Sequence, residues 1–310
     1  MSLRALYVNP MEGEVNPAID AIAYGLQQSL DQAGIDTRML VADFRDPDCV
    51  ARTGAAIRAG TAARVDAIAF YALDPTGPAE AVAEARAAGL PVFTFVRPFF
   101  PVNAAVLYPN FNHGVCMAEW LSERLPAGAR VAIIGGPDTP DDAEEVAGLL
   151  YAFARRGVNV VNDPTDRAWC NLTDVSSGGM EVTLRLLEEH QQLDGLVPYN
   201  DETMLGALEA FDEVGRPDGL QLISRNGSPQ AVEQVRAGRS QGTWDLDASG
   251  IGTTLGDLVV HHLTVESLDD HLGISPVGRM IHAANVASWR PWTDRISVRP
   301  FTIGLDETAP

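Results

Sequence analysis

The sequence of 310 residues is poor in cysteine, in basic residues and in long apolar segments. Its three cysteines, Cys49, Cys116 and Cys170, form no Cys-x-x-Cys pair and no cluster with the spacing of metal ligands, so a zinc site is not expected. One disulfide in an oxidising compartment and three buried, inert thiols both fit these positions. No apolar run approaches the roughly 20 residues that a membrane-spanning helix needs.

Basic residues are scarce: 22 Lys and Arg stand against 42 Asp and Glu, which gives a net charge of −20 at pH 7. Phosphate binding needs a basic surface, so nucleic acid is not expected as a partner. Solubility through net charge explains the acidity without any cationic ligand.

The sequence also lacks the common motifs of catalysis and cofactor binding. It contains no GxGxxG, P-loop, GxSxG or HExxH pattern, and its six histidines are scattered. His261 and His262 are adjacent, so on a helix they would point in different directions. Two spaced acids could hydrolyse a glycoside, but no such pair stands out. We therefore expect no catalytic residues, no cofactor and no enzyme.

Short apolar runs alternate with longer amphipathic stretches, which is typical of βαβ units with parallel sheets. Single hydrophobic cores stop growing beyond roughly 250–300 residues, so two lobes are expected. The predicted strands are Leu3–Val8, Thr37–Val41, Ala67–Tyr71, Pro91–Phe95, Arg130–Ile134, Val158–Val161, Gly195–Tyr199 and Leu220–Ser224. The predicted helices include Ile19–Ala33, Ala79–Ala88, Ala143–Arg155 and Thr203–Val214.

The two halves of the chain correspond. Arg4 opens the first strand of one half and Arg130 that of the other, and the segments around Asp66 and Asp194 read alike, as do those that begin at Gly89 and Gly219. Because these matches occur in the same order at nearly constant separation, they indicate two similarly built α/β units. Ligands bind at the carboxyl ends of parallel strands, so a cleft lined by both sets of strand ends is expected.

Four segments resemble the type I periplasmic solute-binding proteins, in their ribose- and galactose-binding branch. The segment Tyr199–Leu208 resembles the family's Asn-Asp-x-x-Ala-x-Gly-Ala signature. The others are Gly89–Val92 followed by Arg97, the turn Asn226–Pro229 and the helix Ala231–Gly238. The resemblance runs from Leu3 to about Ala287, and the same fold forms the effector domain of lactose-repressor-type regulators.

The resemblance implies two similar three-layer lobes linked by three hinge crossovers. We expect residues 1–109 and 246–274 in the N-terminal lobe, and residues 110–245 and 275–310 in the C-terminal lobe. The crossovers are expected near Tyr108–Asn112, Trp244–Ala248 and Leu272–Val277.

The resemblance further implies capture of a small polar ligand, a sugar or polyol, by hinge closure, and its delivery to the membrane permease of an ABC transporter. The alternatives are a periplasmic sensor that presents its ligand to a membrane receptor, and a regulator's effector domain. A periplasmic location is expected, with the export signal removed from this chain.

The resemblance also implies which residues contact the ligand. Asn200 matches an Asn that binds ligand hydroxyls, with helix capping as its alternative. Arg97 either grips ligand oxygens or forms a surface ion pair. Asn226 stands where the ribose binders have an Asp, with a turn role as its alternative. The remaining candidates are Trp244, Asp245 and Asp247 at the second crossover, Trp169 as a cleft aromatic, and Asn9 with Glu12 in the first loop.

The acidic run 141–145 departs from the family, which has Arg at the start of this helix. Acids favour a helix N-terminus through its dipole, and this explanation suffices. If the acids instead face the ligand, then the ligand would be rich in donors, such as an amine or amino sugar.

Overall fold

The computed structural model describes residues 3–137 and 139–305. The chain divides into two compact units: Met1–Tyr108, Ala248–Pro276 and Trp292–Pro310 make up unit 1, and Pro109–Asp247 with Val277–Pro291 make up unit 2. The chain thus passes between the units four times.

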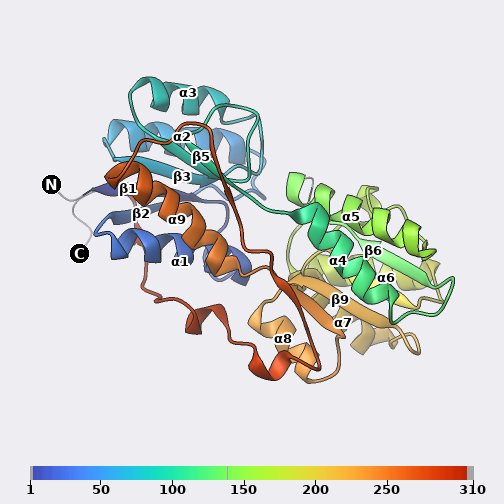
Figure 1. Cartoon of the computed structure of the whole chain (residues 1–310). Helices are drawn as coiled ribbons and strands as arrows, with labels where there is room; N and C mark the ends of the chain where they lie inside the picture. The colour runs from blue at the N-terminus through green and yellow to red at the C-terminus, as the bar shows by residue number, and fades with distance from the viewer. Residues whose placement is uncertain (1–2, 138, 306–310) are drawn as a thin grey trace. The chain divides into compact units, whose positions relative to one another are not determined.

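Unit 1 is a parallel sheet with helices on both faces (Figure 1). Its strand order is β11-β5-β4-β3-β1-β2-β13, and α1 packs against α9 while α2 packs against α3. The strands are β1 (Arg4–Asn9), β2 (Asp36–Val41), β3 (Ala67–Tyr71), β4 (Val92–Phe95), β5 (Ala104–Leu107), β11 (His271–Ile274) and β13 (Thr302–Ile303). The helices are α1 (Pro17–Gln32), α2 (Cys49–Ala62), α3 (Ala79–Ala87), α9 (Ala248–Thr264) and the 3₁₀ turn η3 (Trp292–Asp294).

Unit 2 repeats this plan with the strand order β12-β10-β9-β8-β6-β7, in which only the edge strand β12 is antiparallel among the described pairs. The strands are β6 (Arg130–Ile134), β7 (Asn159–Val160), β8 (Gly195–Pro198), β9 (Gln221–Asn226), β10 (Gly242–Asp245) and β12 (Arg279–His282). The helices are α4 (Asn110–Ser122), α5 (Pro140–Arg156), α6 (Ser176–Glu189), α7 (Asp201–Val214) and α8 (Pro229–Arg236), with the 3₁₀ turns η1 (Arg167–Trp169) and η2 (Val286–Ser288).

The predicted fold class, two α/β lobes built on parallel sheets, is confirmed. The correspondence between the halves extends to hydrogen bonds. The backbone N–H of Arg4 donates to the Asp66 carboxylate at 2.7 Å, and that of Arg130 donates to the Asp194 carboxylate at 2.7 Å. In each unit, an equivalent aspartate therefore fastens the first strand to the turn before the neighbouring strand, which is β3 in unit 1 and β8 in unit 2.

The end of the chain differs from the expectation. We placed residues 275–310 in the C-terminal lobe and expected three crossovers, but the segment from Trp292 belongs to unit 1. The reason is β13, in which Thr302 and Ile303 pair in parallel with Arg38 and Met39 of β2. Two residues are too short a strand for the sequence pattern to reveal.

The central strands are buried runs, as parallel sheets covered on both faces require. In unit 1 the core between the sheet and α2 with α3 includes Leu6, Ile57, Ile68, Phe70 and Val82. In unit 2 the core between the sheet and α6 with α7 includes Ile134, Leu186, Leu196, Met204 and Phe211.

Glycine lets the helices of three pairs approach closely. A Cβ atom on Gly206 of α7 would lie 2.0 Å from the carbonyl oxygen of Ser176 at the start of α6. Similar contacts hold Gly252 of α9 against α1 and Gly148 of α5 against α4. A side chain at any of these positions would push the two backbones apart.

Candidate functional site

In open parallel sheets, ligands bind beyond the carboxyl ends of the strands. In unit 1, Asn9 ends β1 and is buried. Its amide nitrogen donates to the carbonyl oxygen of Met11 at 2.7 Å, and its Oδ1 has no hydrogen-bond partner. Glu12 in the same loop is exposed. This loop therefore offers one buried acceptor and one solvated carboxylate.

Arg97 follows β4 and forms an ion pair with Asp270 at 3.2 Å. The two side chains are 48% and 63% exposed, so this is the surface ion pair that the sequence left as an alternative to ligand binding. Val96 before it has φ = 65°. A β-branched side chain rarely adopts this left-handed conformation, so the backbone that positions Arg97 is strained.

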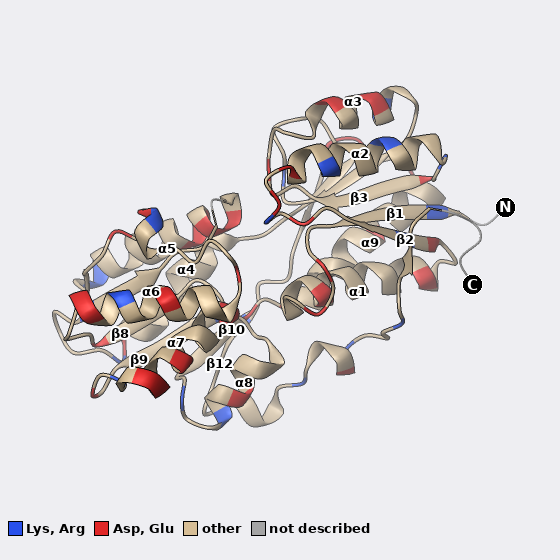
Figure 2. Ribbon diagram, turned by 180° about the vertical axis from the view of Figure 1, so that it is seen from behind, with Lys and Arg blue, Asp and Glu red and all other residues tan. Residues whose placement is uncertain are grey.

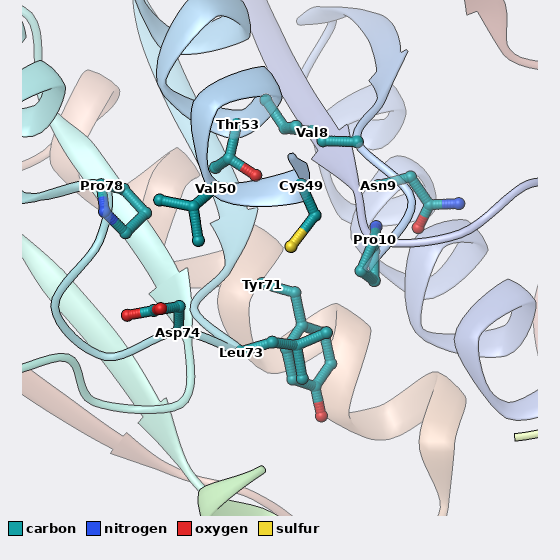
Figure 3. A pocket seen from close by; sticks show the side chains of 11 residues that line it. Val8, Asn9, Pro10, Cys49, Val50, Thr53, Tyr71, Leu73, Asp74 and Pro78 are labelled. Atoms are coloured by element: carbon teal, nitrogen blue, oxygen red, sulfur yellow. The ribbon is translucent and has the colours of Figure 1, made fainter. Parts of the chain in front are cut away.

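A small cavity lies at the ends of β1 and β3 beside the start of α2 (Figure 3). Its volume of about 30 Å³ holds one or two water molecules and no sugar. Cys49 and Thr53 of α2 line it together with Pro10, Tyr71 and Asp74. Burial raises the pKa of the Cys49 thiol, which favours its neutral form.

In unit 2, Asn200 is the N-cap of α7, which is the alternative role that the sequence left open. Its Oδ1 accepts a hydrogen bond from the N–H of Thr203 at 2.9 Å, and its Nδ2 donates to Asp174 Oδ1 at 2.5 Å. The Tyr199 hydroxyl donates to the same Asp174 oxygen. One N–H and one lone pair of the amide are thus used within the unit.

Asp201 ties the start of α7 to β9 and β10. Its buried carboxylate accepts from the hydroxyls of Ser224 and Thr243, the latter at 2.6 Å, and from the N–H of Ser228 at 2.7 Å. Burial raises the pKa of Asp201 to about 6, against the lowering effect of these hydrogen bonds.

Arg225 on β9 is 6% exposed and has two acidic neighbours. Its Nε lies 2.7 Å from Glu145 Oε2, its Nη2 lies 3.4 Å from Asp142 Oδ1, and its Nη1 donates to Asn110 Oδ1 at 3.1 Å. Burial raises the pKa of Glu145 to about 7, and the positive charge of Arg225 partly offsets this. Burial likewise raises the pKa of Asp142 well above its usual range.

Glu202 lies in the first turn of α7 and is 6% exposed. Its carboxylate accepts from the Asn226 side chain, whereas Oε2 has no hydrogen-bond partner. Burial, together with the charges of Asp201 and Asp174, raises the pKa of Glu202 well above its usual range. Asn226 itself has φ = 122°, a strained conformation at the end of β9.

The residues at the end of β10 are used inside unit 2. Asp245 Oδ2 accepts from Trp289 Nε1 at 2.8 Å, and its Oδ1 accepts from the N–H of Asp247 at 2.9 Å. The Trp244 ring is buried with its centroid 5.7 Å from that of His113. Trp169 packs against the unit 2 core, which is the structural role usual for tryptophan.

The structure thus places Asn200 against Asp174 and Asn226 against Glu202, whereas Trp169 is half-buried at the edge of the unit 2 core. Asp174, Glu202 and Arg225 are not among the residues expected at the site. Only Arg225 left a signal, since it is a charged residue in a strand whose other residues are mostly apolar.

Among the described residues, no group of three or more His, Cys, Asp and Glu could hold a metal ion. In the same part of the chain, no helix has the length and apolar character needed to cross a bilayer.

Residues 11–267 match the family model described as "Periplasmic binding protein domain". The ribose import binding protein RbsB of Bacillus subtilis (strain 168) is 26% identical over 65% of both chains, and the D-ribose/D-allose-binding protein of Pseudomonas aeruginosa is 26% identical over 62% of both. The matched part therefore spans less than two thirds of these relatives.

Solved structures share the fold. An ABC transporter periplasmic solute-binding protein of Actinobacillus succinogenes with bound D-allose has a TM-score of 0.81 at 20% identity, covering 93% of this chain and 100% of that one. A solute-binding protein of Bacillus halodurans with bound myo-inositol has a TM-score of 0.78 at 19% identity, covering 93% and 96%.

Proposed function

This chain belongs to the periplasmic binding protein family, and from this membership we propose that it captures a small polar solute, a sugar or polyol, for the permease of an ABC transporter. The observation that carries the proposal is the family match over residues 11–267. Relatives that are named for the binding of ribose and allose, and a solved neighbour with bound myo-inositol, support this class of solute.

The proposed mechanism is binding without chemical transformation. The N-terminal and C-terminal lobes would close on the ligand about their connecting segments, and the ligand would shift an equilibrium between open and closed forms. Of the expected ligand contacts we retain Asn9, Arg97, Asn200 and Asn226, because they lie at strand ends or within two residues of them and carry groups that match adjacent hydroxyls. The exposed ion pair of Arg97 with Asp270 would open to admit ligand oxygens, because such surface pairs add little stability.

We further propose a periplasmic location and a membrane permease as partner, with a membrane receptor as the alternative. A permease in a reconstituted transport assay would accept the ligand-loaded protein, whereas a receptor would respond without transport. A turnover assay, in which each ligand is recovered after binding and compared with the starting compound, tests for catalysis. We expect the ligand to be released unchanged.

The test is a thermal-shift screen over ribose, allose, arabinose and myo-inositol, followed by calorimetric titration. A ligand stabilises the native state by about 2.7 kcal/mol at one hundred times its Kd. Asn200→Ser keeps a capping oxygen but removes the amide, so we expect a loss of affinity, together with a loss of about 1 to 3 kcal/mol of stability from the bond to Asp174. Unchanged affinity in this variant would contradict the site, and no binding by any sugar or polyol would contradict the function.

A further inference from the structure

The last passage of the chain, from Pro291 of unit 2 to Trp292 of unit 1, is held firmly on the unit 2 side. Trp289 is 5% exposed, and its Nε1 donates to Asp245 Oδ2 at 2.8 Å. The indole also packs in a small hydrophobic core that includes Val286. Trp289 is therefore an anchor that fixes the chain to unit 2 shortly before it leaves.

A second anchor holds the chain on the unit 1 side. Trp292 stacks on Tyr24 of α1, with the ring centroids 5.6 Å apart and the planes at 17°. The chain then follows the same helix, where Arg299 forms an ion pair with Asp31, and ends in β13, which pairs with β2. Trp292 is thus the first of several attachments to unit 1.

The link between the two anchors is short and stiff. It consists of Arg290 and Pro291 alone. Because an extended chain advances at most about 3.6 Å per residue, the Cα atoms of Trp289 and Trp292 can lie no more than about 11 Å apart. Pro291 fixes its own φ and disfavours the helical conformation at Arg290. The link can therefore neither stretch much nor fold up.

The passage from Asp247 to Ala248 begins beside the same anchor of unit 2. One oxygen of the Asp245 carboxylate accepts from the Trp289 indole, and the other accepts from the N–H of Asp247 at 2.9 Å. Asp247 has φ = 52°, a left-handed conformation that Asp adopts more readily than most residues. Asp245 therefore holds both the residue at which this passage starts and the anchor of the last one.

The two passages also end beside each other in unit 1. α9 begins with Ala248 and packs along α1, so closely that a Cβ atom on Gly25 would lie 2.1 Å from the carbonyl oxygen of Ser249. Gly25 follows Tyr24, on which Trp292 stacks. Each unit thus holds both passages at one place, and the chain joins the two places by two short, adjacent links.

We propose that residues 289–292 form a tether, anchored by Trp289 and Trp292, that limits hinge opening in the protein without ligand. A single link can bend and twist about several backbone torsions, whereas two adjacent links must move together. Opening beyond the reach of the tether would require an anchor to come off its unit. A narrower range of open forms leaves less conformational freedom to lose when the lobes close. Because the tether acts before any solute binds, this role goes beyond the proposed function.

The experiment measures the distribution of distances between two spin labels in the full chain without ligand, by pulsed electron paramagnetic resonance. One label is attached to Cys116, which is exposed in unit 2, and the other to Ala83→Cys, at an exposed position of α3 in unit 1. The parent protein also carries Cys49→Ser and Cys170→Ser, so that only these two positions are labelled.

In the first variant, the residues Gly-Ser-Gly-Ser are inserted between Arg290 and Pro291, which lengthens the tether and keeps both anchors. We expect the distribution to extend by about 5 Å or more toward longer distances, since four added residues supply up to about 14 Å of reach. In the second variant, Trp292→Ala removes the anchor on unit 1 and should widen the distribution in the same direction. Circular dichroism checks that both variants fold.

The matched control carries the same four-residue insertion at Gly128, in an exposed turn within unit 2. It should leave the distribution unchanged. A distribution as narrow as that of the parent protein, in the insertion variant or in Trp292→Ala, would overturn the tether. Equal widening by the control insertion would overturn it as well.

Discussion

The stability of unit 2 is expected to fall between pH 5 and pH 8, because burial raises the pKa values of some of its carboxyl groups. Burial raises the pKa of Asp201 from 3.8 to about 6 and that of Glu145 from 4.5 to about 7. A raised native pKa gives stability that is complete below the unfolded pKa and is lost as pH rises through the native one. From pH 5 to pH 8 the free energy of unfolding should therefore fall by about 1 kcal/mol through Asp201 and by about 2 to 3 kcal/mol through Glu145.

His113 acts in the opposite direction. Burial lowers its pKa from 6.5 to about 4, and the charge of Arg225 adds to this. Its contribution to stability is present above pH 6.5 and is lost as pH falls toward 4. Between pH 5 and pH 8, His113 therefore raises the free energy of unfolding by about 2 kcal/mol. The free energy of unfolding should therefore fall by about 2 kcal/mol, and the raised pKa values of Asp142 and Glu202 act in the same direction.

The assay is urea unfolding followed by tryptophan fluorescence at pH 5, 6, 7 and 8. Four tryptophans, Trp120, Trp169, Trp244 and Trp289, belong to unit 2, whereas Trp292 belongs to unit 1, so the signal reports mainly on unit 2. Glu145→Gln should remove most of the fall, and His113→Gln should enlarge it to about 4 kcal/mol. A free energy of unfolding that rises from pH 5 to pH 8, or a Glu145→Gln variant with the full fall, would refute the reasoning.

Three further predictions concern packing, charge and strain. Gly206→Ala should destabilise unit 2 by at least about 2 kcal/mol in urea unfolding, because the new Cβ meets a backbone oxygen. Gly54→Ala is the control: the nearest atom to its new Cβ would be 3.5 Å away, so this variant should stabilise its helix by up to about 1 kcal/mol. Equal effects of the two variants would contradict the close approach of α6 and α7. Arg225→Met should lower the free energy of unfolding by about 3 to 5 kcal/mol at pH 8, because it leaves buried acids without their ion-pair partner. Arg97→Met should lower it by less than about 1 kcal/mol, because the ion pair of Arg97 is exposed. A small loss for Arg225→Met would contradict the burial of its ion pairs. Val96→Asn should raise the melting temperature, because Asn tolerates the left-handed conformation and about 1 kcal/mol of strain would be relieved. A lower melting temperature would refute the strained backbone.

Eight of the strands could be predicted because buried parallel strands are mostly apolar runs, whereas β5, β10, β11 and β12 were not among the predicted ranges. Ala67–Tyr71 and Arg130–Ile134 have the predicted bounds, and the predicted helix Thr203–Val214 begins two residues late because the cap is Asn200. The strand β13 could not be predicted, because its two residues are held only by pairing with β2, far away in the sequence.

The candidate site could be predicted less well, since its bonds join distant segments. Arg97 meets Asp270 and Asp245 meets Trp289 only after folding, so their engagement inside one unit leaves no trace in local sequence. The same holds for Asp174, which lies in a loop whose composition resembles any other polar turn. Asn200 was identifiable because a cap has a fixed place before its helix.

The pairing of β13 with β2 also brings the end of the described chain back to the sheet that holds its beginning. Thr302 lies opposite Arg38, which in turn lies opposite Leu6 on β1, so Thr302 and Leu6 are two strands apart, roughly 10 Å. Because these strands are parallel, a linker between the two ends would also have to run back along the strands, and new ends could be opened in an exposed turn such as the one at Gly128. The geometry of this edge therefore makes the chain a natural starting point for circular permutation, with a reporter domain inserted at the new opening.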